Sequence, residues 1–269
     1  MSEANKEEKA KENNKSKAVA EFETVDAKGF MDILRALNVV TDEPTIDVEW
    51  DKMVIKCLDP SRVAMAYFIL PKDMFDEWHV HTPGKAAFYL ENVLKEVNKF
   101  TKDTKMRVFI DSKDRFLTFT LTDTRKRERP FELIEVSTED LPVPKIYFNA
   151  KFKLLAKDMH EDLKDLSEKG CDHVHVETLD GDLIIVGIKD ERRFTNTYRK
   201  RDGPIILDAD VLAESKATYN LSWLPNMVRP ELCDVIALEF ATDKPMKISH
   251  CGKGTFIYYM APRIETETP

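Results

Sequence analysis

Four segments of the chain place apolar side chains at the i, i+3, i+4, i+7 spacing that is typical of amphipathic helices. These predicted helices cover residues 27–39, 90–100, 155–169 and 222–229. Asp26 stands at the N-cap position of the first helix, and Gly170 follows the third where a C-terminal cap is expected. The pattern therefore predicts four helices, each with one face in a core.

Between the helices lie apolar or alternating segments of strand length. We expect strands at residues 45–49, 53–57, 63–70, 106–111, 116–121, 173–178, 183–188, 235–240 and 255–260. The order helix, several strands, helix, several strands occurs twice, over residues 20–133 and 146–264. Leu-Pro-Val-Pro at 141–144 is expected to be extended, because each proline biases its predecessor away from helix. The pattern predicts an α+β fold of two halves built to one plan.

The N-terminal 19 residues consist mainly of lysine, glutamate, asparagine and serine, with almost nothing apolar. Such a segment cannot bury enough surface to offset the entropy lost on ordering, so we expect a disordered tail over residues 1–19. The segment also lacks the apolar region of a secretory signal. We therefore expect an intracellular protein.

Composition excludes several function classes. No apolar stretch approaches the roughly 18 residues that cross a bilayer. The net charge is -8, from 41 basic and 49 acidic residues, so any DNA contact must use a segregated basic patch. The four cysteines lie far apart without a Cys-x-x-Cys pair. Glycine-rich phosphate loops and the hydrolase motifs Gly-x-Ser-x-Gly and His-Glu-x-x-His are missing from the sequence.

Three motifs together resemble a known family. Residues 57–65 read CLDPSRVAM, residues 243–246 read DKPM, and residues 258–265 read YYMAPRIE. In this order and spacing they resemble the signatures of the sliding clamp family, the proliferating cell nuclear antigen (PCNA) of archaea and eukaryotes, here the archaeal type. The resemblance implies an N-terminal clamp domain at 20–133, a connecting loop at 134–146 and a C-terminal clamp domain at 147–265.

The resemblance implies a trimeric ring that encircles duplex DNA, with the helices lining the hole and the strands outside. It also implies a DNA polymerase processivity factor in DNA replication and repair, in the cytoplasm or nucleoid of an archaeon or in a eukaryotic nucleus. Lys95, Lys99 and Lys102 recur at i, i+4, i+7 on the second predicted helix, where sequence-independent phosphate contacts would permit sliding. The DNA-facing residues would be Lys28, Arg35, Lys95, Lys99, Lys102, Lys164 and Arg229.

The family binds short peptides of its client enzymes in a pocket beneath the connecting loop. The clients implied are DNA polymerase, flap endonuclease, DNA ligase and the clamp loader. The matching pocket residues are Leu58, Arg62, Val63, Met65, Leu141, Val143, Pro245, Tyr259, Met260, Ala261, Pro262 and Ile264. Arg62 departs from an otherwise apolar lining and is expected at the rim.

In this family the ring closes by pairing a late strand of the first domain with a strand of the neighbour's second domain. The matching segments here are residues 125–133 and 191–201. The expected interface residues are Arg125, Arg127, Arg129, Arg192, Arg193 and Arg199. Because both edges are basic, like charges would oppose each other in a homotrimer. The sequence therefore favours a heterotrimer with more acidic paralogues, while charged edges that guard against aggregation are the alternative.

Two other functions compete with the clamp. Cys171, His173 and His175 alternate along one predicted strand and could hold zinc, as in a zinc-dependent hydrolase. A peptide-binding adaptor that never encircles DNA would keep the pocket but need no basic helix faces. The clamp interpretation predicts no enzyme activity, no catalytic residue, no metal site and no cofactor.

Overall fold

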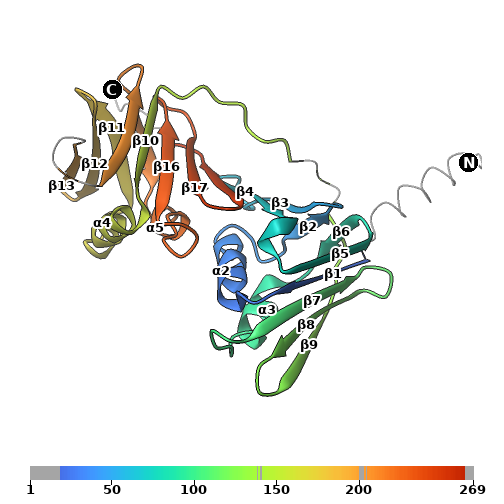
Figure 1. Cartoon of the computed structure of the whole chain (residues 1–269). Coiled ribbons are helices and arrows are strands. Elements are labelled where there is room, and N and C mark those ends of the chain that lie inside the picture. The colour runs from blue at the N-terminus through green and yellow to red at the C-terminus, as the bar shows by residue number, and fades with distance from the viewer. Residues whose placement is uncertain (1–18, 138, 140, 200–202, 204, 264–269) are drawn as a thin grey trace, which may run out of the picture. The chain divides into compact units, whose positions relative to one another are not determined.

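The computed structural model describes residues 19–137, 139, 141–199, 203 and 205–263 (Figure 1). The predicted tail at 1–19 therefore lies outside the described residues, except for Val19, which begins the first strand. The chain divides into two compact units. Unit 1 comprises Met1–Cys57 and Tyr67–Leu141, and unit 2 comprises Leu58–Ala66 and Pro142–Pro269. The clamp-domain boundaries expected at 133 and 147 stay a prediction.

Unit 1 is rich in strands, with two helices. Its elements are β1 (Val19–Thr24), α2 (Ala27–Asn38), β2 (Thr45–Val48), β3 (Lys52–Leu58), β4 (Ala64–Pro71), η1 (Lys72–Met74), β5 (Glu77–Thr82), β6 (Gly84–Ala87), α3 (Leu90–Glu96), β7 (Lys105–Asp111), β8 (Phe116–Thr122) and β9 (Lys126–Glu132). One sheet has the order β5-β1-β7-β8-β9. Alternate residues of β1, β7 and β8 are buried, as expected for a sheet with one face on the core.

Unit 2 repeats this sequence of elements. Its elements are β10 (Ala150–Leu155), α4 (Ala156–Glu168), β11 (His173–Leu179), β12 (Asp182–Lys189), β13 (Arg192–Tyr198), β14 (Ile206–Val211), β15 (Lys216–Asn220), α5 (Leu224–Met227), β16 (Val235–Phe240), β17 (Met246–Cys251) and β18 (Thr255–Met260). Its strand orders, β14-β10-β16-β17-β18 and β13-β12-β11-β15, match β5-β1-β7-β8-β9 and β4-β3-β2-β6 of unit 1. The predicted α+β fold of two similar halves is confirmed.

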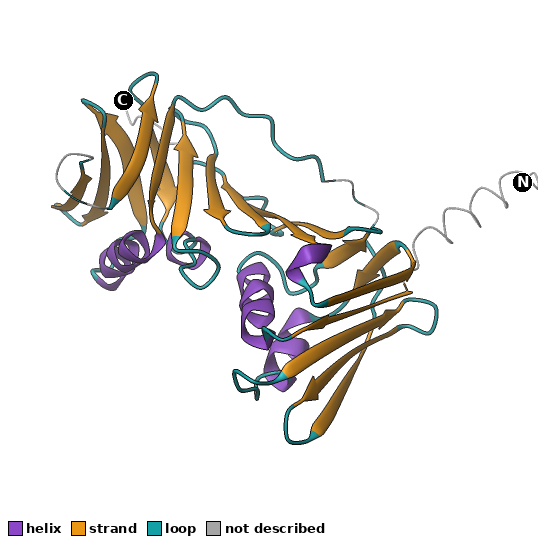
Figure 2. Cartoon of the chain, in the orientation of Figure 1, coloured by secondary structure: helices purple, strands orange, loops and turns teal. Residues whose placement is uncertain are grey.

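The helices of each unit lie side by side against its strands (Figure 2). The Asp26 side chain accepts a hydrogen bond from Gly29 N at 2.8 Å, so the predicted N-cap of α2 is present. Gly170, with φ +80°, ends α4 in the left-handed conformation that glycine adopts most easily. In the described part of the chain, no helix is long and apolar enough to cross a membrane.

Two predicted helices are shorter in the structure. The helix expected at 90–100 ends at Glu96, and the helix expected at 222–229 is reduced to Leu224–Met227. In the first case Val97 leaves the helical conformation at ψ 61°, and Asn98 Nδ2 donates to Lys95 O at 2.6 Å. This side-chain contact satisfies a terminal carbonyl that another helical turn would have used.

Candidate functional site

The exposed side of α2 carries two cations that share one carboxylate. Lys28 Nζ lies 2.6 Å from Asp32 Oδ2, and Arg35 Nη1 lies 2.7 Å from Asp32 Oδ1. The Asp32 carboxylate is largely buried, whereas Lys28 is exposed and Arg35 is half-buried. Both predicted DNA-facing residues of α2 therefore share one face with a fixed geometry, and one of their two charges is neutralised.

The prediction that three lysines share one face of the second helix is wrong. Because α3 ends at Glu96, it carries Lys95 but neither Lys99 nor Lys102, which lie in the loop before β7. Lys95 Nζ forms an ion pair with Glu91 Oε1 at 3.1 Å. The i, i+4, i+7 spacing of the three lysines therefore does not place them on one helical face.

Unit 2 presents fewer cations on its helices. Lys164 on α4 is 64% exposed and lies 3.9 Å from Glu168. Arg229 follows α5 rather than lying within it, and its side chain is only 17% exposed. Its backbone N donates to His250 Nε2 at 3.0 Å, and burial lowers the pKa of His250 to about 4, so this imidazole accepts the bond in its neutral form. Of the two residues, Lys164 is the better placed for a phosphate.

The loop between β3 and β4 is organised by Asp59, a residue that the sequence did not single out. Its carboxylate is buried and accepts from Ser61 N at 2.9 Å, from Ala64 N at 2.5 Å and from the Ser61 hydroxyl. Burial alone would raise the pKa of Asp59, but these hydrogen bonds outweigh it and lower the pKa below its usual value. The Asp-Pro-Ser triplet was the available signal, because aspartate followed by such residues favours an Asx turn.

This loop lies beside the C-terminal strand. Val63 O accepts a hydrogen bond from Ala261 N at 2.7 Å, and both residues belong to unit 2. The predicted pocket residues separate into two groups. Met65, Tyr259 and Met260 are buried in the core, whereas a half-buried group includes Leu58, Val63, Val143, Pro245, Ala261 and Pro262. Arg62 is exposed, Leu141 is half-buried in unit 1, and Ile264 lies outside the described residues.

The structure gives the zinc hypothesis no support. His175 is buried and its Nδ1 lies 2.9 Å from Thr218 Oγ1, and the buried Cys171 packs within 3 Å of where a Cβ on Gly187 would stand. Over the described residues, no group of three histidine, cysteine or carboxylate side chains is arranged to hold a metal ion. Cys171 and His175 are buried and His173 is half-buried in unit 2.

Known proteins resemble the chain over nearly its whole length. A protein of Thermofilum pendens named DNA polymerase sliding clamp is 27% identical over 251 residues, covering 92% of this chain and 100% of the relative. A protein of Methanococcus maripaludis with the same name is 28% identical and covers 90% and 98%. The PCNA structure of Thermococcus kodakaraensis has a TM-score of 0.84 at 20% identity, covering 91% and 100%.

In sequence and in fold, the chain is similar to DNA sliding clamps over nearly its whole length. A second solved structure, the PCNA2–PCNA3 complex of Sulfolobus tokodaii, also reaches a TM-score of 0.84, at 23% identity. No family model matches the chain. The resemblance predicted from the three sequence motifs is confirmed, and the hydrolase and adaptor alternatives receive no support.

The two predicted interface segments are edge strands. β9 ends the five-stranded sheet of unit 1, and β13 ends the four-stranded sheet of unit 2. The arginines do not all face outward. Arg127 is 15% exposed, pairs with Asp123 and donates to Lys99 O at 2.6 Å, while Arg129 donates to Glu128 O at 2.9 Å. Arg192 and Arg193 of β13, and Arg125 just before β9, are exposed.

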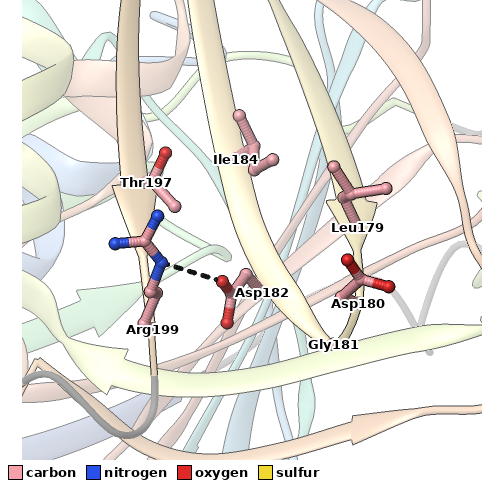
Figure 3. A pocket seen from close by; sticks show the side chains of 7 residues that line it. All are labelled: Leu179, Asp180, Gly181, Asp182, Ile184, Thr197 and Arg199. Atoms are coloured by element: carbon pink, nitrogen blue, oxygen red, sulfur yellow. Dashed lines mark hydrogen bonds and ion pairs between the residues drawn. The ribbon is translucent and has the colours of Figure 1, made fainter.

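A hollow of about 490 Å³ lies beside β13 (Figure 3). Within it Arg199 Nε lies 3.1 Å from Asp182 Oδ2, and the two side chains point toward each other. The predicted interface residue Arg199 is thus held against its own unit. Among the described members of the predicted interface set, Arg125, Arg192, Arg193 and Arg199 are exposed, whereas Arg127 and Arg129 are half-buried.

Proposed function

We propose that this chain is one subunit of a closed sliding clamp, a ring that encircles duplex DNA and keeps a DNA polymerase on its template. The observation that carries the proposal is the sequence similarity to a relative named DNA polymerase sliding clamp, which aligns with this chain over 100% of the relative's own length. The duplicated fold supports it. The protein is a processivity factor with no catalytic activity of its own.

The internal duplication supports closure of the ring. β4 and β13 occupy equivalent places in their units, as do β9 and β18. β9 and β13 both lie at the edges of their sheets, where an edge strand offers backbone groups to another strand. Pairing β9 of one subunit with β13 of the next would join two subunits edge to edge, and three such subunits would close a ring.

The partner subunits are proposed to be paralogues. The proposal depends mainly on the basic edge strand β13, where Arg192 and Arg193 are exposed. β9 contributes less, because the Arg127 side chain is largely buried. A neighbour with an acidic late strand would complement β13 better than β9 of this chain, whose exposed face mixes Lys126 with Glu128.

Sedimentation of the purified chain tests the subunit composition. We expect a monomer at micromolar concentration and moderate salt, and a ring only after a paralogue is added. A stable homotrimer of the chain alone would contradict the heteromeric proposal while leaving the clamp proposal intact.

The DNA contacts are proposed to be weak and sequence-independent. Lys95 and Lys164 are each 64% exposed, and each pairs with a glutamate four residues away on its own helix. Such pairs are worth little in water, so the lysines can exchange glutamate for phosphate at small cost. Topological linkage then keeps the ring on DNA, and weak contacts permit it to slide.

Polymerase stimulation on a primed circular template tests this role. We expect Lys95→Glu combined with Lys164→Glu to lower stimulation by roughly twofold or more, with a larger loss at low salt. Lys153→Glu is the matched control, because Lys153 is exposed on β10 while its neighbours Phe152 and Leu154 point into the core. Equal stimulation by both variants would refute the DNA-facing assignment.

Client enzymes are proposed to bind through short peptides at the half-buried apolar residues of unit 2. Polymerase, flap endonuclease, ligase and clamp loader are the expected clients. The loader must supply ATP hydrolysis, since the sequence holds no phosphate-binding loop. Val143→Glu would place a charge among these apolar residues, so a labelled client peptide is expected to bind the variant more weakly than the wild type.

A further inference from the structure

Arg62 is held in a backbone conformation that arginine rarely adopts. Its φ is +59°, in the left-handed region, and its side chain is exposed. For a residue with a Cβ this conformation is unfavourable, whereas glycine adopts it readily. The surroundings, and not the preference of arginine itself, must therefore fix the turn. Residues held in such conformations cluster at binding and switch sites.

Asp59 fixes the backbone on both sides of Arg62. Arg62 N donates to Asp59 O at 2.9 Å. The Asp59 carboxylate accepts from Ser61 N at 2.9 Å on one side of Arg62 and from Ala64 N at 2.5 Å on the other. The Arg62 side chain therefore projects from a rigid base, which reduces the backbone entropy lost when it binds a ligand.

The backbone of Arg62 lies next to the apolar residues to which client peptides are proposed to bind. The next residue, Val63, is hydrogen-bonded through its carbonyl to Ala261 N at 2.7 Å. Val63, Ala261 and Pro262 are half-buried, and Arg263 beyond them is exposed. Arg263 N donates to Thr218 O at 2.7 Å, so its backbone is fixed as well. Two exposed arginines, Arg62 and Arg263, thus adjoin these apolar residues along the chain, and their positive charge favours a negative ligand.

We propose that Arg62 selects client peptides that carry a carboxylate beside their apolar anchor. The inference rests on the proposed peptide-binding role of this surface and names the chemistry of the preferred peptide. A guanidinium binds a carboxylate through charge-assisted, often paired hydrogen bonds. The apolar anchors would supply most of the affinity, and Arg62 would discriminate between acidic and neutral peptides that share those anchors.

Two labelled synthetic peptides with the same aliphatic and aromatic anchors, and with either Glu or Gln flanking them, test the inference against the full chain. We expect the wild type to bind the Glu peptide about two- to fivefold more tightly than the Gln peptide at low salt. Arg62→Gln should remove this preference, and Arg62→Glu should reverse it. Arg115→Gln is the matched control, because Arg115 also has a left-handed φ, of 63°, but belongs to unit 1.

The outcomes separate this inference from the proposed function. If Arg62→Gln retains the wild-type preference for Glu while Val143→Glu weakens both peptides, the pocket stands and the role of Arg62 is refuted. If Val143→Glu binds both peptides as the wild type does, the pocket lies elsewhere and the inference fails with it. Loss of the preference in Arg62→Gln but not in Arg115→Gln supports the inference.

Discussion

Replacing Asp59 should destabilise unit 2 more than its small side chain suggests. The carboxylate is 3% exposed and accepts hydrogen bonds from Ser61 and Ala64, which stand on either side of the left-handed Arg62. Asp59→Ala removes all of these acceptors at once. The change therefore tests whether a single side chain organises the loop.

The magnitude follows from the burial of each donor. Ala64 is fully buried, so its N–H would be left without a partner, at a cost of about 1–3 kcal/mol. Ser61 is exposed and can regain water, so each of its lost bonds costs about 0.5–1 kcal/mol. We expect Asp59→Ala to lower the free energy of unfolding by about 3 kcal/mol. Asp59→Asn, which keeps the shape and one acceptor oxygen, should lose about half of that.

The effect should depend on pH in one direction. Because the pKa of Asp59 lies below its usual value in the folded chain, the ionised carboxylate stabilises the fold above the unfolded-state pKa of about 3.9. This stabilisation is lost as the pH falls through the lower, folded-state pKa. The difference between the wild type and Asp59→Asn should therefore be full above about pH 5 and shrink as the pH falls below about 4.

Urea denaturation of the full chain measures both effects. Asp47 provides the control, because burial raises its pKa, so its ionised form is disfavoured in the folded state. Asp47→Asn should leave stability at neutral pH unchanged or slightly higher. The reasoning about the Asp59 loop is refuted if Asp59→Ala unfolds within about 0.5 kcal/mol of the wild type, the spread of ordinary surface substitutions.

Two glycine substitutions make further predictions for the same denaturation assay. Gly187→Ala should cost about 1–3 kcal/mol by overpacking, because the new Cβ would lie 2.9 Å from Cys171 Sγ. Gly170→Ala should cost about 1 kcal/mol through backbone strain alone, since its φ is +80° while the nearest side-chain atom to a new Cβ is 3.6 Å away. A larger loss for Gly170→Ala than for Gly187→Ala would contradict this ranking.

Much of the fold could be predicted because the core strands have a clear apolar pattern. The strands expected at 235–240 and 255–260 are found with those bounds, as β16 and β18. β5 is not among the predicted strands, although Trp78 and Val80 alternate with the exposed Glu77, His79 and His81. β10 is not among the predicted strands, although Ala-Lys-Phe-Lys-Leu alternates clearly. Its last residue, Leu155, also begins the apolar periodicity of the helix predicted at 155–169.

The end of α3 shows where apolar periodicity misleads. Val97 is fully buried and continues the apolar stripe of the helix, although the backbone has already left the helical conformation. Burial was therefore predicted correctly and conformation was not. The informative signal was Asn98, whose amide reaches back to Lys95 O, as polar residues near a helix C-terminus often do.

The edge strands show why charge counts did not suffice to describe the interface. In a strand, successive side chains point to opposite faces, so Lys126, Glu128 and Glu132 share the exposed face of β9 while Arg127 and Arg129 share the other. The segment of β9 looks basic in the sequence, but its exposed face carries one lysine and two glutamates. The direction of Arg127 depends on Asp123 and on the Lys99 carbonyl, which come from a turn and from the loop after α3. Neither contact could be predicted from the sequence, so β13, with exposed Arg192 and Arg193, is the basic edge that favours the proposed paralogue partners.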